Sequence, residues 1–416
     1  MGKKYVAWLM LSGLFICYVI SNGVILNTLP IFYPELISEF GWDQAEVTRP
    51  AQWLFFIVAL ISPVIGTILD RGNPRRVMLG GTLLMIAAFF WFAHIRGLLE
   101  MTGVYVLFSL GIVMGGIIPS MYILTKWFVR YRGIAVGILL VGSSFGGTLF
   151  NPIAAWGIAT LGWRGSLLLL GAIAAICMLG SLFLFIRNRP EDIGLGPDGR
   201  EDGPSPENSP GRGSLEGPAL GDALRSPSFY LLMLVTGAMW FCIVGVIQHQ
   251  ALYFKDIGER LPSSAGVLSV FFFCSILGKL LFGKLGDRYP KKHIMLIATL
   301  NLALGALLLV WLESYPAMVW AYAVVFGIGF SGTFTMIQVL VADFYAGKAY
   351  GKILGIVTMV DTLSGVMGIL VLGQLRSAQG NYAQALLILL VVSATAAACV
   401  PFVKNPAKKS VTIETT

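Results

Sequence analysis

Two charged residues lie inside long apolar stretches of the sequence. Lys279 falls in FFFCSILGKLLFG and Asp361 falls in GIVTMVDTLSGVMG. A charged side chain at the centre of a membrane-spanning helix costs at least about 3 kcal/mol, so such residues almost always face a cavity or a partner. An ammonium group can bind a carboxylate, and a carboxyl group can carry a proton. These two residues are therefore the first candidates for chemistry.

The positions of the two residues suggest that they meet. Lys279 lies eight residues before Asp287, where its apolar run ends, and Asp361 lies eight residues after Ile353, where its own run begins. At 1.5 Å per residue, both lie about 12 Å from the same membrane boundary. Opposite charges at one depth are expected to pair. The pair is either a static bridge between two helices or a site where an anion takes the place of the acid.

The elements that must position these residues are membrane-spanning helices. The chain has 416 residues, of which 56% are hydrophobic and 12% charged, and its mean hydropathy is +0.80. Soluble domains carry about 25% charged residues. The apolar windows are about 20 residues long and show no alternation of period two, which indicates helices and argues against a barrel. The predicted spans cover residues 6–30, 48–69, 77–94, 104–124, 134–158, 166–186, 228–253, 266–285, 294–312, 317–340, 353–374 and 383–403.

The distribution of basic residues predicts the orientation. If the N-terminus is cytoplasmic, loops on that side hold 22 of the 29 Lys and Arg residues. This bias predicts that both termini are cytoplasmic, and it accounts for the net charge of +8 without a nucleic-acid partner. The five cysteines all lie in predicted spans without a CxxC pair, which favours core packing. We expect neither a metal nor a cofactor.

The sequence divides into two similar halves. Residues 187–227 are rich in Pro, Gly, Ser and charge, which predicts a cytoplasmic linker with a mobile middle. The linker separates an N-terminal bundle, 1–186, from a C-terminal bundle, 228–416. A GxxxDR motif follows the second and the eighth span at identical spacing, 217 residues apart, and a second pair of similar segments begins at Tyr131 and Tyr350. We predict an all-α membrane protein of twelve helices in two parallel six-helix repeats.

These paired motifs resemble the signature of the major facilitator superfamily. The resemblance implies a gating motif whose charges are broken and remade between domains, although the basic residues could instead only anchor the topology. A carboxylate at the end of span two would also be favoured by the N-terminus of span three. The motif consists of Gly66, Asp70, Arg71, Gly283, Asp287 and Arg288.

Four further segments narrow the resemblance. EFGWDQAEVTRP, WFVRYRGIAVGILLVGSSFGG, LGWRGSLLLLG and RNRPEDIGLGPDG are similar, in that order, to the monocarboxylate porter and oxalate:formate exchanger branch. In that branch a basic residue in span eight binds the substrate carboxylate, and Lys279 falls at that position. The chain has Lys where the porters usually have Arg, and it has an acid in span eleven where oxalate exchangers have a base. One cation opposed by one acid favours a monoanion.

The resemblance implies a secondary active transporter of small monocarboxylates, such as lactate or pyruvate, that works by alternating access. We expect Lys279 to bind the carboxylate and Asp361 to take up a proton, which gives symport. His249, where the family often has a histidine, is an accessory proton candidate. Each remaining candidate competes with a simple interhelical hydrogen bond or core contact. The candidates for substrate binding are Asn27, Ser144, Phe330, Phe334 and Tyr382.

Other functions stay open at this point. One alternative is an organic-anion exchanger without net proton transport, and another is a facilitator of a different small solute. An enzyme is disfavoured, because the three histidines are scattered and neither HExxH nor GxSxG occurs. The expected partners are a small organic anion, protons and the lipid bilayer. We expect a functional monomer in a bacterial inner membrane.

Overall fold

The computed structural model describes residues 4–200, 217–257 and 264–405. Apart from an isolated bridge between Gly196 and Arg200, the regular elements of these residues are all helices. Eleven of the described helices are long and apolar enough to cross a membrane. The predicted all-α membrane fold is therefore confirmed.

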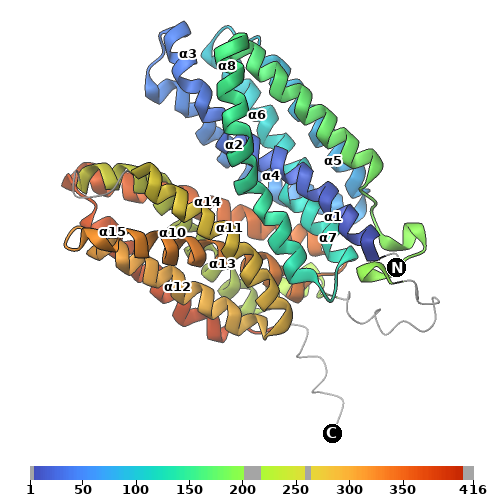
Figure 1. Ribbon diagram of the computed structural model, residues 1–416. Helices are drawn as coiled ribbons and strands as arrows, with labels where there is room; N and C mark the ends of the chain where they lie inside the picture. The colour runs from blue at the N-terminus through green and yellow to red at the C-terminus, as the bar shows by residue number, and fades with distance from the viewer. Residues whose placement is uncertain (1–3, 201–216, 258–263, 406–416) are drawn as a thin grey trace. The chain divides into compact units, whose positions relative to one another are not determined.

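The chain forms two compact units (Figure 1). Unit 1 comprises Met1–Arg130, Ile138–Gly213 and Tyr350–Met359. Its helices are α1 (Lys4–Tyr18), the π-helix η1 (Val19–Val24), α2 (Ile25–Asn27), η2 (Leu29–Phe32), α3 (Tyr33–Phe40), α4 (Gln44–Arg71), α5 (Pro74–Phe92), α6 (Leu98–Gly115), α7 (Ile117–Trp127) and most of α8 (Arg132–Leu184). Two short 3-10 helices, η3 (Pro190–Ile193) and η4 (Pro197–Gly199), follow α8.

The long helix α8 contains two of the predicted spans. At Gly162 the backbone has φ 70° and ψ 168°, which is not helical. Glycine enters this region without steric cost, because it has no Cβ atom. The sequence 134–158 lies before this break and 166–186 after it. Counting the two arms separately gives the twelve spans of two six-helix repeats.

Unit 2 comprises Tyr131–Gly137, Ser214–Ala349 and Val360–Thr416. Its helices are α9 (Leu220–Arg225), α10 (Pro227–Ile257), α11 (Ser264–Arg288), α12 (Lys291–Trp311), η7 (Pro316–Met318), α13 (Val319–Tyr345), most of α14 (Tyr350–Gln379), α15 (Ala383–Cys399) and η8 (Val400–Phe402). The first residues of α8 thus belong to unit 2, and the first residues of α14 belong to unit 1. The domains predicted from sequence contain no such exchange.

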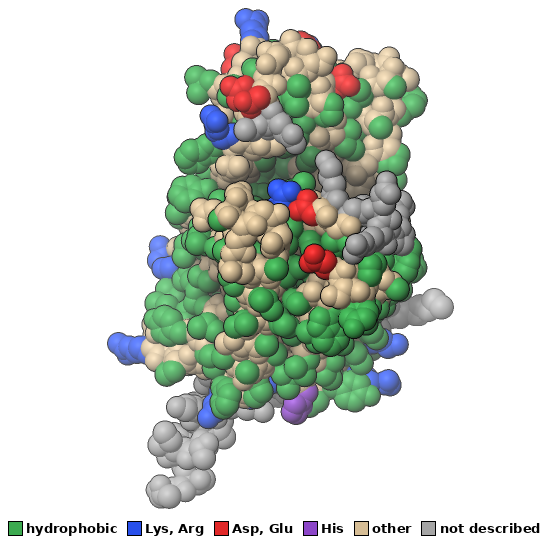
Figure 2. Space-filling model, turned by 90° about the vertical axis from the view of Figure 1, so that its left-hand side faces the viewer, with side chains coloured by type: hydrophobic (Ala, Val, Ile, Leu, Met, Phe, Trp, Pro, Cys, Tyr) green, Lys and Arg blue, Asp and Glu red, His purple; other side chains and the backbone are tan. Residues whose placement is uncertain are grey.

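Local sequence accounts for the ends of several helices. Asp43 accepts a hydrogen bond from the Glu46 amide, and Glu46 accepts one from the Asp43 amide, so the two form a capping box for α4. Asn73 caps α5 by accepting a hydrogen bond from the amide of Arg76. Hydrophobic side chains are widespread on the face drawn in Figure 2, as expected of helices that contact lipid.

The described parts of the predicted linker are folded. Asp198 accepts hydrogen bonds from the amides of Val129 and Arg130, at 3.3 and 3.0 Å, and thereby fastens η4 to the segment after α7. Its φ of 60° is tolerated because a short polar side chain can occupy the left-handed region. The middle of the linker, 201–216, lies outside the described residues.

Candidate functional site

Lys279 lies in unit 2, on α11, at a close helix crossing. Its carbonyl oxygen lies 2.5 Å from where a Cβ atom on Gly137 would be, so only glycine lets α8 approach α11 at this point. The side chain is 1% exposed. Its Nζ lies 5.9 Å from the ring centroids of both Phe330 and Phe334, on α13. The faces of these rings stabilise a cation at such distances.

An aromatic wall extends from the lysine in two directions. Phe330 stacks on Phe334, with centroids 6.4 Å apart, and on Phe271 of α11, with centroids 5.8 Å apart. Phe334 also meets Trp240 of α10 edge to face at 5.2 Å. Three helices of unit 2 therefore contribute rings to a wall that reaches the buried side chain of Lys279.

Asp361 lies on α14 and is 4% exposed. The polar groups next to its carboxyl group are the Thr236 hydroxyl and the Trp240 indole, both on α10. Oδ1 of Asp361 and Nε1 of Trp240 nevertheless have no hydrogen-bond partner among the described residues. A buried polar atom without a partner costs about 1–3 kcal/mol.

The ion pair expected between Lys279 and Asp361 is not formed. Between pairs of described residues, the ion pairs within 4.0 Å are Arg164–Glu39, Lys291–Asp343 and Arg376–Asp256, and Asp361 is in none of them. The contacts explain this result. Lys279 lies over the phenylalanines of α13, whereas Asp361 faces α10, and the contact of Phe334 with Trp240 joins the two environments.

Further buried polar atoms lie on the same stretches of α11 and α13. Ser275 is one helical turn before Lys279, and Thr333, Thr335 and Gln338 flank or follow Phe334. Within the part of the chain that the structure describes, the side-chain oxygens of all four, the amide Oε1 in the case of Gln338, are buried without a hydrogen-bond partner. Native cores keep such atoms few, and each one calls for an explanation. These atoms lie on the same stretches of α11 and α13 as Lys279, Phe330 and Phe334, and they add polar groups to a mostly apolar bundle.

His249 is part of a second cluster in unit 2. Its Nε2 lies 3.0 Å from the carbonyl oxygen of Ile369, so Nε2 carries the proton and donates it. Its Nδ1 accepts from the Tyr382 hydroxyl at 2.9 Å. Tyr382 lies between α14 and α15, where burial raises the pKa of its phenol and keeps it a donor. Arg376, paired with Asp256, lies over the Tyr382 ring.

The structure therefore separates the predicted candidates into groups. Lys279, Phe330 and Phe334 lie together, and Tyr382 lies with His249. Asn27 and Ser144 belong to unit 1, where the Asn27 amide donates to the carbonyl oxygen of Ser143 at 2.9 Å. Their roles in binding stay predictions.

The two copies of the GxxxDR motif form equivalent contacts. In unit 1, Asp70 accepts hydrogen bonds from the amides of Gly351 and Lys352, at 2.7 and 2.9 Å. In unit 2, Asp287 accepts from the amides of Gly133 and Ile134, at 2.5 and 2.8 Å. Each carboxylate thus caps a helix N-terminus, α14 or α8, which bears partial positive charge. Span three, which we expected to be the partner of Asp70, has its own cap in Asn73.

The motif glycines permit these contacts. A Cβ atom on Gly66 would overlap the carbonyl oxygen of Gly351, and one on Gly283 would overlap that of Gly133. One helical turn before Gly66 and Gly283, a second close contact recurs in both units. The carbonyl oxygen of Ser62 lies against Gly355, and that of Lys279 lies against Gly137. The repeat thus extends to the position of the buried lysine. Arg71 and Arg288 are exposed at the ends of α4 and α11.

Sequence reasoning missed Thr236 and Trp240, the neighbours of Asp361. A signal for Trp240 was present, because tryptophans in membrane helices concentrate at the interfaces and this one lies within an apolar span. Thr236 gave no comparable signal.

Membrane-length helices in two repeats, with charged side chains buried among them, are typical of membrane transport proteins. The sequence profile described as "Major Facilitator Superfamily" matches residues 14–268 and 261–415. The chain belongs to this family.

Individual relatives agree with this placement. The chain is 26% identical over 393 residues to "Monocarboxylate transporter 13" of Bos taurus, covering 90% of this chain and 84% of the relative. It is 24% identical to "Monocarboxylate transporter 2" of Homo sapiens, and the match covers 90% of this chain and 80% of the relative. Among solved structures, an outward-conformation crystal structure of the family transporter FucP matches with a TM-score of 0.71 at 14% identity, covering 95% of this chain and 98% of FucP. That likeness shows the fold.

Proposed function

We propose that this transporter carries small monocarboxylates, such as lactate or pyruvate, in symport with protons. The observation that carries the proposal is the buried ammonium group of Lys279 against the stacked rings of Phe330 and Phe334. A cation beside an apolar wall suits a small anion with a short alkyl or aryl tail. The names of the monocarboxylate transporter relatives support the same substrate class.

In this proposal Lys279 binds the substrate carboxylate and Asp361 carries the proton. Charge balance supplies the coupling, since the two residues form no direct bond. The loaded protein holds an ammonium group, a substrate anion and a protonated acid, and the empty protein holds an ammonium group and a carboxylate. Both are neutral inside the membrane, where net charge is costly. These two states therefore change access between the two sides most readily.

Other predicted residues have supporting roles in the proposal. Phe330 and Phe334 shape the tail site, and Asn27, Ser144 and Tyr382 add polar contacts. His249 is an accessory proton site. Asp70 and Asp287 release and re-form their helix caps during alternating access. We further propose a monomer in a bacterial inner membrane with both termini in the cytoplasm, as the basic loops indicate.

A ligand panel tests the substrate class. Purified protein is heated with lactate, pyruvate, formate, acetate, benzoate and a neutral sugar, and the shift in Tm is measured. A ligand that binds only the native state raises stability by RT ln(1 + [L]/Kd). We expect one or more monocarboxylates to raise Tm and the sugar to have no effect.

Substitution of the lysine sharpens the test. Lys279→Gln should weaken monocarboxylate binding on the order of a hundredfold, because a buried charge contact is lost. Lys279→Arg should retain part of the binding. Lys284→Gln, which removes an exposed lysine from the same helix, is the matched control and should bind normally. Undiminished binding by Lys279→Gln would rule out the proposed site.

A further inference from the structure

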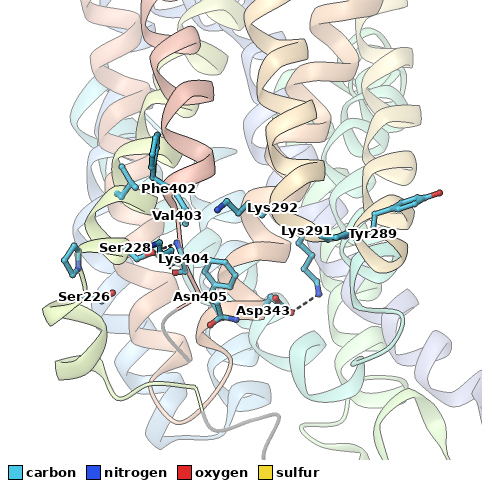
Figure 3. A pocket seen from close by; sticks show the side chains of 14 residues that line it. Ser226, Ser228, Tyr289, Lys291, Lys292, Asp343, Phe402, Val403, Lys404 and Asn405 are labelled. Atoms are coloured by element: carbon cyan, nitrogen blue, oxygen red, sulfur yellow. Dashed lines mark hydrogen bonds and ion pairs between the residues drawn. The ribbon is translucent and has the colours of Figure 1, made fainter. Parts of the chain in front are cut away.

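A pocket of about 860 Å³ opens at one end of unit 2 (Figure 3). It lies where α10 and α12 begin and where α13 and η8 end. The basic loops of the sequence assign this end of the helices to the cytoplasm. No residue of α11 up to Arg288 lines the pocket, so it is separate from the Lys279 site.

The pocket carries excess positive charge. Lys291, Lys292 and Lys404 line it, together with a single acid, Asp343. Nζ of Lys291 pairs with Asp343 at 2.8 Å. Lys292 instead extends across the pocket toward the side of Ser228 and Val403 (Figure 3). Two positive charges are thus left in excess over the acid.

The wall beside Lys404 is fixed. The Ser228 hydroxyl donates to the carbonyl oxygen of Lys404 at 2.5 Å and accepts from its amide at 2.7 Å. This exchange fastens the segment after η8 to the start of α10. Pro290 makes no side-chain cap for α12, and its carbonyl oxygen accepts from the amides of His293 and Ile294, so the amides of Lys291 and Lys292 are the ones that α12 adds. Lysines and helix amides therefore come from α12 and from the segment after η8.

Apolar side chains lie at the rim of the pocket and in a small cavity next to it. Lys292 also lines this second cavity, together with Leu232, Met295 and Leu340 of α10, α12 and α13. At the rim, Tyr289 and Phe402 are 52% and 68% exposed. Exposed aromatic residues at helix ends are typical of the membrane interface. The pocket therefore combines cations with a surface suited to the headgroup region of a bilayer.

We propose that this pocket binds a phosphate group, as presented by the headgroup of an anionic phospholipid. Lys292 and Lys404 contact the phosphate oxygens, and the amides of Lys291 and Lys292 at the start of α12 lie beside them. Lysines between membrane helices at the cytoplasmic surface bind such headgroups through charge. The rim aromatics lie against the glycerol and upper acyl region.

Full-length protein in nanodiscs tests this proposal. Phosphatidylcholine discs are compared with discs that also contain phosphatidylglycerol, and Tm and retained lipid, by native mass spectrometry, are measured. We expect phosphatidylglycerol to raise Tm and to stay bound. Lys292→Gln with Lys404→Gln should weaken this binding on the order of tenfold or more. Lys292→Arg with Lys404→Arg should preserve it.

A control pair separates the pocket from general surface charge. Lys284→Gln with Lys348→Gln removes the same charge from exposed positions outside the pocket and should bind lipid normally. If the pocket pair keeps the wild-type lipid effect, or if the control pair loses as much, the proposal is overturned. Glycerol 3-phosphate added to phosphatidylcholine discs distinguishes the source. If glycerol 3-phosphate raises the Tm of the wild type but not of Lys292→Gln, and phosphatidylglycerol has no effect, the pocket binds phosphate from a soluble ester. The lipid part of the proposal is then wrong.

Discussion

Lys279 owes its position to a glycine on another helix and to two rings on a third. Gly137 lets the backbone of α8 approach the lysine carbonyl, and Phe330 and Phe334 present their faces to the ammonium group. The lysine is thus placed by packing.

Asp361 allows a test of proton coupling at the scale of a single residue. Asp361→Asn preserves the shape of the side chain but cannot take up a proton. In proteoliposomes the variant should lose accumulation driven by a pH gradient and should keep counterflow exchange, because the ammonium group and the rings are unchanged.

The control for this variant is Glu313→Gln, which removes an exposed acid that makes no ion pair among the described residues. It should accumulate substrate like the wild type. If Asp361→Asn also accumulates substrate against a gradient, Asp361 is not the coupling group. An exchange mechanism or another proton carrier would then apply.

At the scale of elements, the two similar segment pairs in the sequence turn out to be partners. The GxxxDR end of α4 meets the start of α14, and the GxxxDR end of α11 meets the start of α8. In both cases an aspartate caps the second and third amides of the partner helix. The same geometry built twice explains why glycine and aspartate recur at one spacing.

This interpretation predicts the effect of adding a methyl group where α11 crosses the start of α8. Gly283→Ala would place a methyl group against the carbonyl oxygen of Gly133, so the helices must separate. We expect destabilisation of about 1–3 kcal/mol, typical of overpacking. The measurement is thermal unfolding of the purified protein.

Gly180→Ala is the control, because a Cβ atom there would meet nothing within 4 Å. It should be neutral or stabilise by up to about 1 kcal/mol through helix propensity. Equal destabilisation by both substitutions would show that the crossing imposes no particular demand for glycine.

At the scale of the whole molecule, the proposed cycle moves no net charge. One monoanion and one proton enter together, and the empty protein returns with ammonium balanced by carboxylate. Transport into proteoliposomes should therefore respond to a pH gradient and should not respond to a membrane potential set with potassium and valinomycin. A rate that follows the potential at constant pH would contradict one-to-one coupling.

The sequence by itself determined the class of the protein. Apolar windows of membrane length, the bias of basic loops and the two GxxxDR motifs were sufficient for a twelve-helix, two-repeat fold, because a bilayer forces helices and limits their length. The cost of burying charge was also sufficient to identify Lys279 and Asp361 as the charged residues inside membrane spans.

Only the tertiary structure decided which groups meet. Equal depth in the membrane suggested that Lys279 and Asp361 pair, but depth does not fix the direction in which a side chain leaves its helix. The structure turns the lysine to the rings of α13 and the acid to Thr236 and Trp240 of α10. It likewise places the Asp70 carboxylate at the start of α14, whereas Asn73 caps α5. The rotation of each helix about its axis, and the helices it packs against, depend on packing over the whole bundle. A local pattern in one sequence does not predict them.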